Sequence, residues 1–137
     1  MTANQLLDYQ ISQSGRQVEA CLSGMTSEAF ESKTNGMSPQ EILIHLSEAY
    51  QAFLTVAKGE KHNWGSFVVA DRSMSAVLDI FRNLRQEAAE LAASTGEEAV
   101  IKEGYDYVVA HDNYHVGQLV LSRLQSEPGW DAYSIYS

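Results

Sequence analysis

Apolar residues recur along most of this chain at intervals of three and four positions, which is the spacing of one face of an α-helix. The pattern predicts four helices, over residues of about 3–22, 38–58, 71–94 and 103–125. Alternation of apolar and polar residues, typical of a strand, never extends beyond a few positions. We therefore expect an all-α chain that folds as one antiparallel four-helix bundle over residues 1–137.

The second of these helices has the clearest start. Ser38 suits the N-cap position and Pro39 suits the first helical position. Glu41 then completes a capping box with Ser38. A connection at 25–37, with a short helical turn at 27–31, precedes this start, and a polar loop, GEKHNWGSF (59–67), follows the helix.

Charge narrows the range of partners. The chain has 18 acidic and 9 basic residues, which gives a net charge of -9. An acidic surface without a basic patch repels phosphate groups, so neither nucleic acid nor an anionic membrane is an expected partner. The single cysteine, Cys21, excludes an intramolecular disulfide and is expected to be buried and unreactive. The first residues do not resemble a signal peptide and no apolar stretch reaches about 20 residues, so we expect a cytoplasmic protein.

Histidines provide the candidate chemistry. His111 and His115 are four positions apart on the last predicted helix, so both imidazoles project from one helix face and can bind one metal ion. His45 lies in the apolar stripe of the second helix. A single core histidine is more often only hydrogen-bonded, so the residues alone leave both a metal site and three core histidines open.

Two segments resemble the signatures of the DinB-like (YfiT-like) superfamily. MSPQEILIHLSEAY (37–50) is similar to the second helix of that family, where a Ser/Thr-Pro cap precedes a histidine followed by leucine. HDNYHVGQLVLSRLQ (111–125) is similar to its fourth helix, where a histidine pair precedes Gly-Gln-Leu and an arginine. The ending PGWDAYSIY also resembles the family. One departure is Met37, which stands where many relatives have tryptophan.

The resemblance implies a four-helix bundle that binds one divalent metal ion through His45, His111 and His115. It also implies a homodimer, and either a metal-dependent hydrolase or a transferase of low-molecular-weight thiols acting on a small molecule. Three neutral imidazoles leave coordination positions open, which is typical of a catalytic metal site. Zinc or nickel is the ion we expect first, with iron, manganese or copper as alternatives.

Several other residues are candidates for a role near the site. Glu48, three positions after His45, is a candidate base or a partner that orients an imidazole, and a solvated helix glutamate is the alternative. We expect Arg123 to pair with an acidic side chain and His62 to be a loop histidine. Gly117 indicates close helix packing or room beside a pocket.

A non-enzymatic protein is the alternative function. In that case the histidines would only support the bundle, and the chain would act by dimerising or by binding a small molecule. A coordination sphere sealed by side chains would favour this alternative, whereas an open position facing a pocket would favour an enzyme. The tyrosine-rich ending is a further candidate for partner binding, although the resemblance implies that it packs on the bundle.

Overall fold

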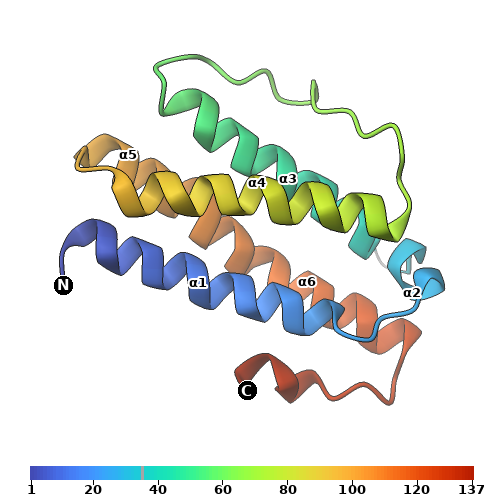
Figure 1. Cartoon of the computed structure of the whole chain (residues 1–137). Helices are drawn as coiled ribbons and strands as arrows, with labels where there is room; N and C mark the ends of the chain where they lie inside the picture. The colour runs from blue at the N-terminus through green and yellow to red at the C-terminus, as the bar shows by residue number, and fades with distance from the viewer. Residues whose placement is uncertain (35) are drawn as a thin grey trace.

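The computed structural model describes residues 1–34 and 36–137, which fold as packed helices (Figure 1). The helices are α1 (Ala3–Leu22), α2 (Ser27–Glu31), α3 (Pro39–Val56), α4 (Met74–Ser94), α5 (Glu98–Gly104) and α6 (His111–Ser126). A π-helical segment, η1 (Tyr105–Ala110), joins α5 to α6, and a 3-10 helix, η2 (Ala132–Tyr136), ends the chain. No strand occurs in the described ranges, so the all-α prediction is confirmed.

Capping explains where α3 begins. The Ser38 hydroxyl accepts a hydrogen bond from the backbone N–H of Glu41 at 3.1 Å. The Glu41 carboxylate accepts one from the backbone N–H of Ser38 at 3.2 Å. These two bonds form the capping box expected from the sequence. A second capping box, between Thr2 and Gln5, starts α1.

The long helices direct their apolar stripes into one core. α1 packs against α4 and α6, and α3 packs against the same two helices. Burial of each large apolar side chain stabilises the fold by about 1.5–3 kcal/mol. The largest fully buried side chains are Tyr50, Phe30, Phe53, Phe81, Ile11, Ile42, Leu43, Leu46 and Leu119.

The directions of the helices differ from the expected alternation, because α3 and α4 run side by side in the same direction (Figure 1). The Gln40 amide donates to the Arg72 carbonyl at 2.6 Å near both helix starts. Arg85 donates to the Tyr50 hydroxyl at 2.7 Å farther along. α1 runs antiparallel to α4, and α3 runs antiparallel to α6 (Figure 1).

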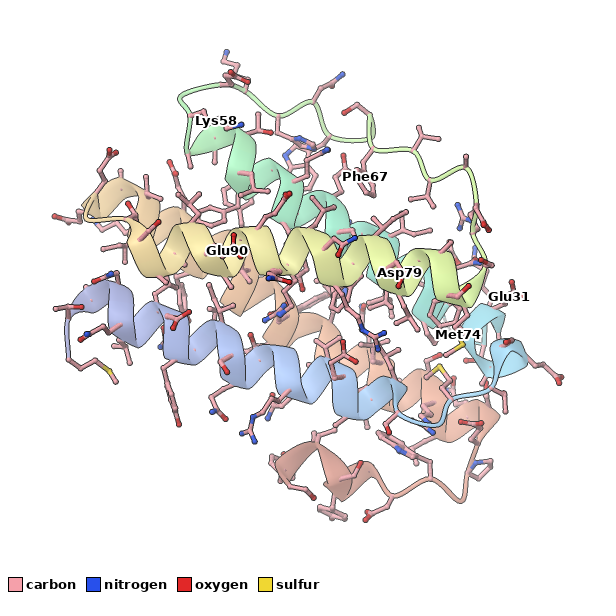
Figure 2. All side chains as sticks on the ribbon, viewed as in Figure 1. Glu31, Lys58, Phe67, Met74, Asp79 and Glu90 are labelled. Carbon is pink, nitrogen blue, oxygen red and sulfur yellow. The ribbon has the colours of Figure 1, made fainter. Side chains whose placement is uncertain are left out.

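The parallel pair depends on a long connection, residues 57–73, which we call the crossover segment. Figure 2 shows Lys58 and Met74 at opposite ends of α3, with Phe67 between them. α3 has 18 residues and is therefore about 27 Å long. The crossover segment can span roughly 56 Å when extended, so it can return along the whole of α3.

The fourth predicted helix begins earlier than residue 103 and is not uniform. It starts at Glu98 as α5 and passes through the π-helical segment before α6. Gly104 lies at the join, where an added Cβ would be 2.9 Å from Leu7 Cδ2 and 3.1 Å from Phe53 Cζ. The missing side chain therefore lets α5 approach α1 and α3 closely.

The tail packs back on the bundle, as the family resemblance implied. η2 contacts α1, and Trp130 and Ile135 pack against the core. The Arg123 guanidinium lies 4.7 Å from the centre of the Trp130 ring. Tyr133 and Tyr136 are exposed. Among the described residues, no helix combines the length and the apolar character needed to cross a membrane.

Candidate metal centre

Three histidines converge where α3 faces the start of α6. His45 comes from the middle of α3, and His111 and His115 occupy the first two turns of α6. One ring nitrogen from each lies within 4.8 Å of the others. The His45 Nε2 and His111 Nε2 atoms are 3.2 Å apart. The sequence therefore identified three residues that the fold does bring together.

Burial differs among the three imidazoles. His115 is 4% exposed, whereas His45 and His111 are only partly buried. His45 and His111 meet edge to face, with ring centres 4.9 Å apart. The cluster therefore lies at the edge of the core: His115 is buried, whereas His45 and His111 each keep part of their surface accessible.

Gln118 fixes the orientation of His115. Its side-chain oxygen lies 2.7 Å from His115 Nδ1, one helical turn farther along α6. An amide oxygen only accepts hydrogen bonds, so Nδ1 carries the proton and the lone pair is on Nε2. A hydrogen bond of this kind is the usual support of a metal-binding histidine.

The environment keeps the α6 histidines neutral. The pKa of His115 is lowered to about 4, chiefly by burial, with His45 and His111 acting in the same direction and Gln118 in the opposite one. Burial and His45 also lower the pKa of His111, whereas the Tyr107 carbonyl and the Asp112 carboxylate act in the opposite direction. Neutral imidazoles are the form that binds metal, so these side chains are suited to a divalent ion.

The donor set fits a three-coordinate protein site. Two nitrogens bound tetrahedrally at 2.0–2.1 Å from zinc would be about 3.3 Å apart, close to the 3.2 Å between His45 and His111. No fourth histidine, cysteine or carboxylate joins the group within the described part of the chain. Such a site can hold an ion and still leave a position for a small molecule.

A small cavity adjoins the histidine cluster through Gln118. Its volume is about 190 Å³, and it lies between the start of α3 and α6. The Ser122 hydroxyl is buried beside it and has no hydrogen-bond partner among the described residues. A larger groove of about 580 Å³ lies between α1 and α4. Neither cavity has a histidine in its lining, and the smaller one is linked to the cluster only by the contact between Gln118 and His115.

Glu48 does not orient a metal ligand. Its carboxylate lies 2.8 Å from His62 Nε2 and accepts a hydrogen bond from the Gly65 N–H at 2.9 Å. Glu48 is 8% exposed, so the alternative of a solvated glutamate is wrong. It anchors the crossover segment to α3, and His62, a loop histidine as predicted, is its partner, with a side chain only 5% exposed.

Asp112 is a buried residue whose importance the sequence did not indicate. It has no exposed surface, although it follows His111 directly. Its carboxylate is 2.7 Å from Arg85 Nη1 and accepts hydrogen bonds from the hydroxyls of Ser14, at 2.6 Å, and Tyr50. This network joins α1, α3, α4 and α6 directly behind the histidine cluster.

The remaining candidates have structural roles or none. Arg123 pairs with Glu127 at 2.9 Å, as predicted. Cys21 is buried, and burial raises the pKa of its thiol to about 12, which agrees with the prediction that it is unreactive. An added Cβ at Gly117 would meet nothing within 4 Å, so the suggested close packing there is wrong.

Comparisons with known proteins give no relative for this chain. No family model matches it, and searches of curated proteins and of solved structures find no significant match. The case for a metal centre therefore depends on the geometry of His45, His111 and His115, and the DinB-like resemblance stays a prediction.

Proposed function

We propose that this chain is a DinB-like four-helix bundle that binds one divalent ion through His45, His111 and His115. We further propose that it transfers a low-molecular-weight thiol to a small electrophilic molecule, with metal-dependent hydrolysis as the second candidate. The observation that carries the proposal is the convergence of three imidazole nitrogens within 4.8 Å, with no fourth such ligand among the described residues.

The arrangement of the long helices supports the bundle. α1, α3, α4 and α6 each pack against two of the other three, which is the contact pattern of a four-helix bundle. The two segments that resemble the family signatures, 37–50 and 111–125, lie on α3 and α6, and their histidines face one another. Long crossover connections occur in some bundles of this kind, so parallel neighbours are compatible with the assignment.

An open site supports an enzyme over a structural site. Zinc or nickel bound there would act as a Lewis acid that activates a thiol or polarises an electrophile. Gln118 orients His115, and burial keeps the imidazole of His115 unprotonated. The adjoining cavity of about 190 Å³ provides space for part of a small molecule.

The state of Glu48 favours thiol transfer over hydrolysis. Hydrolysis at neutral pH commonly uses a carboxylate base to activate water. Glu48 was the carboxylate suggested for that role, and it is already bonded to His62 and Gly65. A thiol has a pKa of about 8.5, so it needs less assistance to lose its proton than water does.

Thiol transfer can be written with ordinary chemical balance. The thiol sulfur forms a bond to the electrophilic carbon of the acceptor, and the bond from that carbon to its leaving group breaks. The leaving group takes the bonding electron pair, and the thiol proton passes to solvent. In this reaction His45, His111 and His115 would hold the metal, and Gln118 would orient His115.

A direct assay uses zinc- or nickel-loaded protein with glutathione or cysteine and monochlorobimane, whose carbon–chlorine bond breaks as the fluorescent thioether forms. We expect metal-dependent turnover that His115→Ala abolishes. Asn113→Ala, at an exposed position between the two α6 ligands, is the matched control and should retain activity. Turnover that is equal in the His115→Ala variant would contradict the proposal, and ester hydrolysis without thiol transfer would favour the second candidate.

A further inference from the structure

The crossover segment has a fixed path although it forms no helix or strand of its own. Loops of this length in a compact domain are uncommon and are usually functional or disordered. This one is held to α3 by Glu48, whose carboxylate contacts the His62 ring and the Gly65 N–H. The side chains of His62 and Glu48 are only 5% and 11% exposed. The segment is therefore anchored at its middle, beside the metal centre.

Backbone conformation at the anchor depends on glycine. Gly65 has a φ of 90°, a region that side-chain-bearing residues rarely adopt. This conformation accompanies the donation of its N–H to Glu48. Hydrogen bonds from His62 and Gly65 lower the pKa of Glu48 although burial alone would raise it, so the anchor is a carboxylate at neutral pH.

Trp64, between the two anchored residues, is held against the histidine cluster. Its ring meets the edge of the His62 ring, with centres 4.7 Å apart. It stacks nearly parallel to Tyr107, with an interplanar angle of 11° and a centre-to-centre distance of 6.2 Å. The centre of its ring is 6.4 Å from that of His45. Even so, Trp64 is 48% exposed.

We propose that Trp64 and Tyr107 form an aromatic wall of the metal centre that binds an aromatic or apolar group of the substrate. Glu48 is then a positioning residue, which acts by holding Trp64 in place. This inference rests on the proposed function, because it assigns the substrate class to the same site. The substrate would carry a metal-binding or electrophilic group at one end and a flat, apolar group at the other.

The geometry supports a wall in preference to a simple surface aromatic. A tryptophan that served only for packing would be mostly buried, whereas Trp64 is 48% exposed beside a proposed ligand of the site. Its neighbours on two sides are aromatic, so its orientation is restricted. A stacked aromatic pair contributes enough to change affinity by about 2- to 12-fold.

A matched pair of probes tests this wall. Acetohydroxamate and benzohydroxamate both bind divalent metals through the same group, and only the second has a phenyl ring. Their dissociation constants can be measured by the visible absorption of protein loaded with Co²⁺. We expect the ratio of the two constants to favour benzohydroxamate in the parent and to fall by about 2- to 12-fold in Trp64→Ala. Affinity for acetohydroxamate should stay unchanged.

Glu48 is tested in the same assay. Glu48→Gln should reduce the preference for benzohydroxamate while one Co²⁺ per chain is retained, and Trp64→Phe should restore part of the preference lost in Trp64→Ala. Glu60→Gln, at an exposed glutamate of the same segment, is the control and should change nothing. In a Trp130→Phe background, quenching of Trp64 fluorescence by Co²⁺ should also weaken on Glu48→Gln, because the indole moves away from the site.

The outcomes separate this inference from the proposed function. A probe ratio that is the same in the parent and in Trp64→Ala, with Co²⁺ bound to both, would overturn the aromatic wall and leave the metal centre intact. Unchanged preference and unchanged quenching in Glu48→Gln would overturn the positioning role. Failure of the parent to bind Co²⁺ would overturn the metal centre, and the wall with it.

Discussion

Replacing Asp112 with asparagine is predicted to destabilise the protein strongly, although the two side chains have almost the same size. Asp112 has no exposed surface and forms a 2.7 Å ion pair with Arg85. Asparagine would leave the Arg85 guanidinium, whose side chain is 12% exposed, without its counter-charge. Breaking a buried pair by removing one partner costs about 3–5 kcal/mol.

Neighbouring donors make the loss larger than the ion pair alone suggests. Ser14 and Tyr50 both donate to the same carboxylate, and burial followed by Asp112 raises the pKa of Tyr50, so the phenol stays protonated. The asparagine amide group would present N–H donors where at least one of these partners also donates. Against a total stability of about 5–15 kcal/mol, the variant should be close to the limit of folding.

Urea unfolding followed by circular dichroism measures this cost. With a slope of about 2 kcal/mol/M, the midpoint for Asp112→Asn should fall by at least about 2 M. The control is Glu19→Gln, which breaks the ion pair with Arg82 on the surface, where the side chains are 41% and 51% exposed. That change should cost no more than about 1 kcal/mol. Equal midpoint shifts in the two variants would show that the buried ion pair contributes no more than the exposed one.

Three further predictions concern pH, reactivity and packing. Because the pKa of His115 is about 4 in the folded chain and about 6.5 when unfolded, metal-free protein should have its full stability above pH 6.5. Its free energy of unfolding should fall by up to about 3 kcal/mol as the pH falls from 6.5 towards 4. Urea unfolding measures this change, and an equal loss in the His115→Gln variant would contradict the prediction. Cys21, with a thiol pKa raised to about 12 by burial, should react with Ellman's reagent at pH 8 only after unfolding, so rapid labelling of native protein would count against it. Gly104→Ala should lower stability by about 1–2 kcal/mol because its Cβ would be 2.9 Å from a Leu7 methyl group, while Gly117→Ala, with open space, should raise it by about 0.5–1 kcal/mol. Thermal melting of the two variants compares these effects, and a shift of the same sign in both would be the contrary result.

The histidine cluster could be predicted from sequence because helical periodicity places side chains on faces. His111 and His115 are four residues apart and His45 lies in an apolar stripe, so the local pattern made all three candidates. The resemblance to the DinB-like signatures then grouped them as one ligand set. The same pattern gave the limits of α1 and the capped start of α3, where hydrogen bonds are made within one turn. These features depend on contacts between residues close together in the chain.

Asp112 and Trp64 could not be found in this way, because their environments come from distant segments. Asp112 faces away from the histidines, and only the approach of α1, α3 and α4 makes that face a buried polar network. Trp64 lies in a segment without periodicity, whose path depends on Glu48 from another element. The parallel run of α3 and α4 also depends on that path. The apolar periodicity of the two helices does not determine their relative direction, so the sequence predicted an antiparallel pair instead.

The metal content of the purified protein tests the three-histidine site directly. Protein purified without a histidine tag is analysed by inductively coupled plasma mass spectrometry, beside the His111→Ala, His115→Ala double variant and the exposed control Asn113→Ala. We predict about one equivalent of zinc or nickel per chain in the parent and the control, and almost none in the double variant. No metal in the parent, together with no uptake when zinc or nickel is added, would contradict the metal centre on which this account depends.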